Sequence, residues 1–169
     1  MSQNDLYERA TADYGAALDR LARAYEADPE RRRDLLQEIH LQLWRSLGSF
    51  DGRCSLRTWI YRVAHHTATS HMIRERKLRL SLISIEDLDV IADPDPQKLS
   101  AQQQLEMLSA MIRRLKAMDR QIIVCYLEGL DAASTGEITG LSPGNIAMKI
   151  HRIKNILARR FRTGGSHES

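Results

Sequence analysis

Apolar residues recur at spacings of three and four along the first part of the chain, as on one face of a helix. The first such series consists of Tyr14, Ala17, Leu18, Leu21 and Tyr25. Asp28 then stands where an N-cap belongs, and Pro29 occupies the first position of a second helix. Gly48 predicts the end of that helix. Its apolar stripe consists of Leu35, Leu36, Ile39, Leu43 and Leu47.

A third helix is predicted from Thr58 to about Arg76 by the same periodicity. Its expected buried residues are Trp59, Ile60, Val63, Ala64 and Thr67. Trp44 and Trp59 both fall on or near apolar stripes, so we expect both tryptophans in the core. No segment shows the alternating pattern of a strand, which favours an all-α fold.

The pattern breaks at residues 78–98, which carry five acidic side chains against two basic ones. The Asp-Pro-Asp-Pro run at 93–96 disfavours a helix, so we interpret the segment as a flexible acidic linker. Helical spacing then resumes at Ala101, Leu105, Leu108, Ile112 and Leu115. The sequence therefore predicts two small helical modules, over residues 1–77 and 99–163, joined by the linker at residues 78–98. Residues 164–169 are predicted to form a disordered tail.

The second module ends in a pattern typical of a helix-turn-helix. Asp119 is expected to cap one short helix that ends at Gly129. A further short helix over residues 132–139 leads through Gly140-Leu-Ser to an N-cap at Ser142. The last helix has a predicted buried stripe of Ile146, Ile150, Ile153 and Leu157. Its outward positions are Asn145, Lys149, Arg152 and Lys154.

The charged side chains of this last helix are all basic. Six basic side chains lie between Lys149 and Arg162, and no acid occurs at residues 138–162, although the formal net charge of the chain is only +3. One interpretation is DNA binding, because such a helix fits the major groove, where Lys or Arg pairs with guanine and Asn with adenine. The other is a basic amphipathic helix with a solvated face.

Other kinds of site find little support in the sequence. Cys54 and Cys125 lie far apart without a CxxC partner, so we expect both to stay reduced. The N-terminus does not resemble a secretory signal and no apolar run is long enough to span a membrane, which predicts a soluble cytoplasmic protein. His65, His66 and His71 have the wrong spacing for one metal-binding helix face. We therefore expect no metal, no cofactor, no catalytic residues and no enzymatic activity.

Four segments resemble, in order, the extracytoplasmic-function sigma factors of bacterial RNA polymerase. The segment EITGLSPGNIAMKIHRIK (137–154) and its lead-in LKAMDRQIIVCYLEGL (115–130) resemble the promoter-reading helix-turn-helix of that family. DLLQEIHLQLW (34–44) resembles the helix that binds the polymerase clamp. SFDGRCSLRTWIYRVA (49–64) resembles the promoter-opening segment. The resemblance covers nearly the whole chain.

One segment and one single position depart from the family pattern. Residues 132–136 read Ala-Ala-Ser-Thr-Gly, where the family usually has an aromatic and acids followed by Ile-Ala. Gly136 costs about 1 kcal/mol of helix propensity relative to alanine. His66 stands where the family commonly has Asn. Both departures bear on the strength and sequence preference of DNA binding.

The resemblance implies a sigma factor that binds core RNA polymerase, recognises the promoter −35 and −10 elements and supports DNA opening. Its implied partners are core polymerase, duplex and single-stranded promoter DNA, and an anti-sigma factor. The implied upstream-element residues are Ser142, Asn145, Lys149, His151, Arg152 and Lys154. The implied downstream-element and melting residues are Phe50, Arg53, Ser55, Tyr61, Arg62 and His66. The implied polymerase-binding residues are Asp34, Gln37 and Glu38.

Alternatives stay open at the level of the residues. Phe50 either stacks on a base or fills the core beneath its loop. Asp34, Gln37 and Glu38 are either a polymerase contact or solvated polar positions. For the whole chain, the alternatives are a stand-alone helix-turn-helix regulator of transcription and a structural helical adaptor.

Overall fold

The regular structure of the chain is helical throughout the described ranges, which confirms the all-α prediction. A computed structural model describes residues 1–80 and 99–163, with side chains to Lys77 and to Arg160. The predicted linker and tail lie outside the described residues, except that the third helix extends to Leu80. The helices in chain order are α1 (Gln3–Tyr25), α2 (Pro29–Leu47), α3 (Leu56–Leu80), α4 (Ala101–Arg113), α5 (Ala117–Leu127), α6 (Ala132–Thr139) and α7 (Pro143–Thr163).

Except for α5, the helices begin where a side chain accepts hydrogen bonds from their first backbone N–H groups. The Asp28 carboxylate accepts hydrogen bonds from the backbone of Glu30 and Arg31, which confirms the predicted cap of α2. Ser100 forms a capping box with Gln103 at the start of α4. The predicted cap at Asp119 is wrong. Helix α5 already begins at Ala117, so Asp119 lies inside its first turn.

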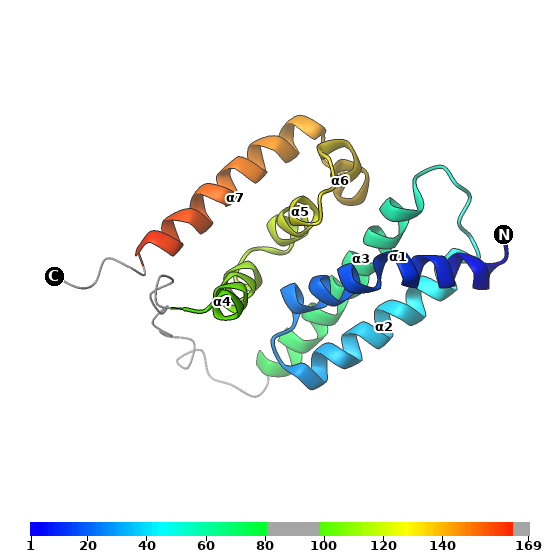
Figure 1. Ribbon diagram of the computed structural model, residues 1–169, viewed down its shortest axis with the longest axis horizontal. Coiled ribbons are helices and arrows are strands. Elements are labelled where there is room, and N and C mark those ends of the chain that lie inside the picture. Colours follow the sequence, from blue (N-terminus) through cyan, green and yellow to red (C-terminus); the bar gives the residue numbers. More distant parts are fainter. Residues whose placement is uncertain (81–98, 164–169) are drawn as a thin grey trace.

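Helices α1, α2 and α3 form the N-terminal module, a three-helix bundle (Figure 1). Its fully buried residues include Leu18, Leu21, Leu35, Ile39, Leu43 and Ile60. The prediction that Trp44 lies in the core is wrong. Trp44 is 41% exposed, and its indole N–H donates to the Asn4 side chain at 3.1 Å. Trp59 is half-buried and donates to the Ser46 hydroxyl.

Helices α4 to α7 form the C-terminal module, in which α6 and α7 pack on α5. Gly140 adopts φ 81°, a left-handed conformation that ends α6 and turns the chain toward α7. Gly136 lets the backbone of Leu141 lie close against α6. A Cβ built on Gly136 would lie 2.6 Å from the carbonyl oxygen of Leu141. The glycine that weakens α6 by propensity is therefore required by the tight turn that follows it.

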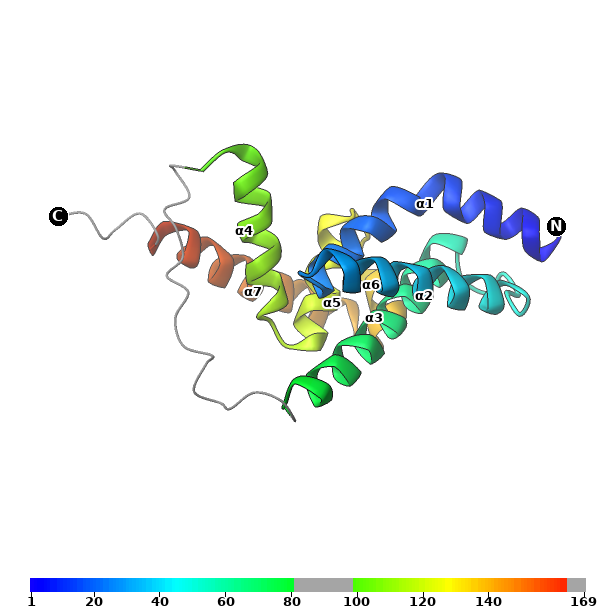
Figure 2. The same cartoon turned by 90° about the horizontal axis from the view of Figure 1, so that it is seen from below.

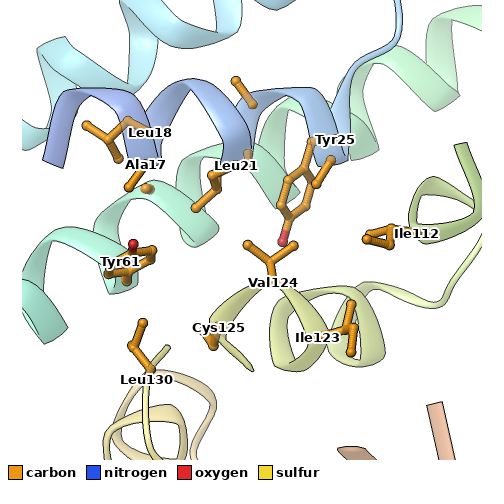
Figure 3. Close-up of a cluster of buried hydrophobic side chains, with 14 of the residues drawn as sticks. Ala17, Leu18, Leu21, Tyr25, Tyr61, Ile112, Ile123, Val124, Cys125 and Leu130 are labelled. Atoms are coloured by element: carbon orange, nitrogen blue, oxygen red, sulfur yellow. The ribbon is translucent and has the colours of Figure 1, made fainter. Parts of the chain in front are cut away.

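The two modules pack against each other. Helices α1 and α3 contact α4, α5 and α6, and Figures 1 and 2 show α5 beside the N-terminal bundle. One buried cluster crosses the boundary, with Tyr25 and Tyr61 on one side and Val124, Cys125 and Leu130 on the other (Figure 3). In this arrangement the candidate surfaces of the two modules belong to one packed body.

Candidate nucleic-acid interface

Helix α7 presents a basic face to solvent. The Ser142 hydroxyl accepts a hydrogen bond from the Asn145 backbone N–H at 3.3 Å, so Ser142 acts as the N-cap. The apolar residues Ile146 and Ile153 are buried on the opposite face. Because burial fixes the rotation of the helix, the polar positions point outward. The exposed members of the predicted upstream set are Ser142, Asn145, His151, Arg152 and Lys154.

Two lysines of this face already have partners within the chain. Lys149 is half-buried and lies 3.5 Å from the Asp119 carboxylate of α5. Lys154 lies 5.1 Å over the ring of Tyr126 and donates to its hydroxyl at 3.2 Å. A DNA phosphate would have to compete with Asp119 for Lys149. Arg152 and His151 are exposed without that competition from Asp119, so they are better placed for a first contact.

The α2–α3 loop holds the first part of the predicted melting set. Gly52 has φ 76°, which lets the loop turn sharply. The Arg53 side chain is 90% exposed and pairs with Asp51 at 3.0 Å. Ser55 has a structural role that the sequence analysis missed, because its hydroxyl accepts from the backbone N–H of Thr58 at 3.1 Å and thereby caps α3.

Phe50 packs on the protein rather than standing free. Its ring lies edge-to-face on Trp59, with centroids 5.3 Å apart, and it is half-buried against the core. This geometry favours the alternative in which Phe50 fills the space beneath the loop. Its partly exposed ring still borders the loop that carries Arg53.

The α3 members of the melting set differ in their access to solvent. Tyr61 is 1% exposed, so it is not available for stacking on a base in this arrangement, contrary to the expectation. Arg62 donates to the backbone carbonyl of Glu137 in α6 at 2.9 Å. His66 is exposed. Arg62, His66 and Ile138 border a cleft of about 630 Å³ that also reaches Glu38 and Gln121.

The other two histidines of α3, His65 and His71, are buried and form contacts within the protein core. Burial lowers the pKa of His65 to about 3, so the ring is neutral, with its Nδ1 2.8 Å from the Tyr25 hydroxyl. His71 lies 3.4 Å from the Glu26 carboxylate. Within the described residues, no group of three or more His, Cys, Asp or Glu side chains gathers as a metal site would require.

A separate candidate surface lies on the outer face of α2. Asp34 and Gln37 are exposed as expected, whereas Glu38 is half-buried and receives two hydrogen bonds from Arg74 at 2.8 and 2.9 Å. This face also carries two large apolar side chains that were not predicted to lie at the surface. Leu41 is 47% exposed and Trp44 is 41% exposed. Their positions seven and ten residues after Asp34 place them on its side of the helix, and this spacing could have identified them.

Comparison with known proteins gives one family, by a family model for the N-terminal module and by relatives that match more than two thirds of the chain. A family model described as sigma-70 region 2 matches residues 11–78. RNA polymerase sigma factor YlaC of Bacillus subtilis is 28% identical over 128 residues, covering 74% of each chain. The RNA polymerase sigma-H factor of Pseudomonas aeruginosa is 32% identical over 122 residues, which cover 71% of this chain and 62% of that protein.

The fold agrees with this assignment. The sigma factor RpoE of Bartonella quintana, solved in complex with the anti-sigma factor NepR, superposes with a TM-score of 0.72 at 19% identity. The match covers 92% of this chain and 96% of that one. None of the helices in the described ranges combines the length and apolarity that a membrane crossing requires. The order of the motifs, the helical architecture and the relatives agree, and the chain belongs to the extracytoplasmic-function sigma factors of the sigma-70 family.

Proposed function

We propose that this chain binds core RNA polymerase and directs it to promoters, with α7 contacting the upstream element and the α2–α3 region contacting the downstream element. The exposed basic face of α7 is the observation that carries the proposal. Its cap at Ser142 and its buried stripe orient Asn145 and Arg152 outward, where a major groove can accept them. The chain itself performs no chemistry, which belongs to the polymerase.

Arg152→Ala is expected to lower affinity for duplex promoter DNA by about 1–2 kcal/mol. If Arg152 contacts a base, specificity should relax at one position. If it contacts a phosphate, affinity should fall evenly across sequences and the salt slope should decrease by about one. Fluorescence anisotropy at several salt concentrations distinguishes the two.

Arg9→Ala provides the matched control for Arg152→Ala, because Arg9 is an exposed arginine of α1 that pairs with the exposed Asp13. Loss of a charge there should leave promoter affinity nearly unchanged. Equal affinities and salt slopes for wild type and Arg152→Ala would contradict the proposal that this face of α7 contacts DNA.

The outer face of α2 is the proposed surface for core polymerase. Its polar residues Asp34 and Gln37 adjoin the exposed apolar side chains of Leu41 and Trp44. Large exposed apolar side chains bordered by polar groups are typical of protein interfaces, and tryptophan is enriched among residues whose truncation costs most affinity. The pairing of Glu38 with Arg74 leaves Asp34 as the more accessible carboxylate.

Trp44→Ala should weaken binding to core polymerase by about 2 kcal/mol, roughly thirtyfold. Its contact with Asn4 lies at the surface, so helical content should change little. Ile73→Ala is the control, because Ile73 is a similarly exposed apolar residue on α3, at 48%. Core affinity can be measured by competition against a labelled sigma factor. Indistinguishable affinities for Trp44→Ala and Ile73→Ala would rule out this face.

Promoter opening is proposed to depend on the exposed Arg53. A base leaving the duplex loses a few kcal/mol of stacking, which contacts in a receiving loop must offset. Arg53→Ala should slow formation of permanganate-reactive open DNA by about tenfold while closed-complex affinity stays the same. Changing Ser55 as well would confound the experiment, because Ser55 caps α3. Normal opening by Arg53→Ala on fully paired DNA would refute this role.

A further inference from the structure

Helix α7 carries one large apolar side chain on the face that its exposed polar and basic residues share. Met148 is 72% exposed, and among the large apolar residues of the described ranges only Met1 is more exposed. Single exposed apolar residues are common on protein surfaces, so exposure alone assigns no role. The role of Met148 follows from its place on the helix and from its chemistry.

Met148 lies between the two polar residues that the proposed function directs at bases. Asn145 precedes it by three positions and Arg152 follows it by four, so the three side chains share one side of the helix. The buried Ile146 and Ile153 on the opposite side fix this rotation. Helix α7 packs on α5 and α6, and Figure 1 shows it along the edge of the molecule, away from the N-terminal bundle.

The neighbours of Met148 leave it free to reach a surface that docks on α7. Gly144 lies one turn earlier on the same side, and a Cβ built there would meet nothing within 4 Å. Ala147 is exposed but short. Because helical side chains lean toward the N-terminus, Met148 extends over this sparsely covered turn. In helix-turn-helix proteins, the N-terminal residues of the second helix are those that contact base edges.

The chemistry of methionine restricts what Met148 can recognise in DNA. Its side chain has no hydrogen-bond donor, and its thioether sulfur is only a weak acceptor, so phosphates offer it no partner. Base edges in the major groove present donors, acceptors and one apolar group, which is the C5-methyl of thymine. The long, unbranched and polarizable side chain of methionine adapts well to such an apolar contact.

We propose that Met148 is a specificity-determining residue that contacts the C5-methyl group of a thymine in the upstream element. This inference rests on the proposed function, since it adds an apolar contact to the polar contacts of the same helix. No acid occurs at residues 138–162, so the charge around Met148 favours duplex DNA as the ligand. The contact would select thymine over cytosine at one position, where a hydrogen-bonding side chain is absent.

Deoxyuridine differs from thymidine only by the missing methyl group and provides the direct test. The full chain is assembled with core polymerase, and its affinity is measured for a promoter fragment in which each upstream thymine is replaced in turn. For wild type, one of these replacements should lower affinity about fourfold, the effect of one buried methyl group. For Met148→Ala, affinity for the unmodified fragment should already be lower by about this factor or more, and that same replacement should have no further effect.

Two further variants serve as controls. Met148→Leu keeps an apolar side chain of similar volume, so it should retain the response to the missing methyl group. Leu105→Ala removes another exposed apolar side chain, on α4, where Leu105 is 60% exposed. It should respond to every replacement as wild type does. Each variant is compared with itself on two DNA fragments, so a general loss of folding or of core affinity does not affect the comparison.

The outcomes separate this inference from the proposed function. Polymerase that depends on the upstream element, yet responds equally to deoxyuridine with wild type and with Met148→Ala, would overturn the role of Met148 alone. Met148→Ala that weakens core binding and leaves the deoxyuridine response intact would identify a protein contact instead, and would also overturn it. A complex whose DNA affinity is independent of the upstream element would overturn the proposed function itself.

Discussion

Gly136→Ala is expected to destabilise the C-terminal module by about 3 kcal/mol, near the upper end of the cost of overpacking. The added methyl would lie 2.6 Å from the Leu141 carbonyl oxygen, a backbone atom that can move only if the turn between α6 and α7 moves. The gain of about 1 kcal/mol in helix propensity offsets only part of this cost. Urea denaturation followed by circular dichroism measures the difference.

Gly144→Ala is the matched control for Gly136→Ala. Gly144 lies in the first turn of α7, and a Cβ built there meets nothing within 4 Å. This substitution should leave stability unchanged or raise it by up to about 1 kcal/mol, through helix propensity alone. Equal stabilities for the two alanine variants would contradict the close contact seen at Gly136.

Acidification is expected to destabilise the chain through His65. Burial lowers the pKa of His65 to about 3 in the folded state, whereas the unfolded chain takes up the proton near pH 6.5. The unfolded state therefore binds more protons between these values, and stability falls as the pH falls through this window. The loss should reach about 3 kcal/mol at pH 4.5, at roughly 1.4 kcal/mol per pH unit.

A comparison between variants isolates this contribution. Burial also lowers the pKa of His40, so both wild type and His65→Gln should lose some stability in acid. The free energy of unfolding of His65→Gln should depend less steeply on pH between 6.5 and 4.5, although its stability at pH 7.5 is lower because the bond to Tyr25 is altered. Urea titrations at four pH values measure both slopes. Parallel slopes would show that His65 is not the group responsible.

Local signals in the sequence predict much of the fold. Asp28 and Pro29 locate the start of α2, and residues 132–139 coincide with α6. Ser142 marks the start of α7. These elements are predictable because caps and glycine conformations act within a few residues. The same locality explains the error at Asp119, since a good capping residue type also occurs inside a first turn, where its charge is favourable.

Contacts between distant segments are outside the reach of such signals. Glu128 and Arg20 are 108 residues apart in the chain, and nothing in the periodicity of either helix pairs them. The burial of Tyr61 depends on that packing, so a residue expected to meet DNA lies inside a module boundary. Trp44 is a different case. Its indole is large and apolar, yet the face of α2 that carries it also carries the polar Asp34 and Gln37.

The residues of the candidate site also differ in how far the sequence alone predicts their surroundings. The exposure of Asn145 and Arg152 follows from the buried stripe of their own helix, which a sequence can show. The partners of Lys149 and Glu38 come from other helices, so their occupied state becomes visible only in the structure. A sequence can therefore predict the exposure of residues whose neighbours are local, whereas contacts with other helices follow only from the packing of the whole chain.

Transcription in vitro with purified core polymerase and genomic DNA fragments tests the central claim most directly. We expect transcripts that begin at defined sites only when the chain is added, and that weaken with Arg152→Ala and with Trp44→Ala. The contrary result is a chain that binds duplex DNA but neither associates with core polymerase nor yields such transcripts. That result would identify a stand-alone DNA-binding regulator and refute the proposed role in initiation.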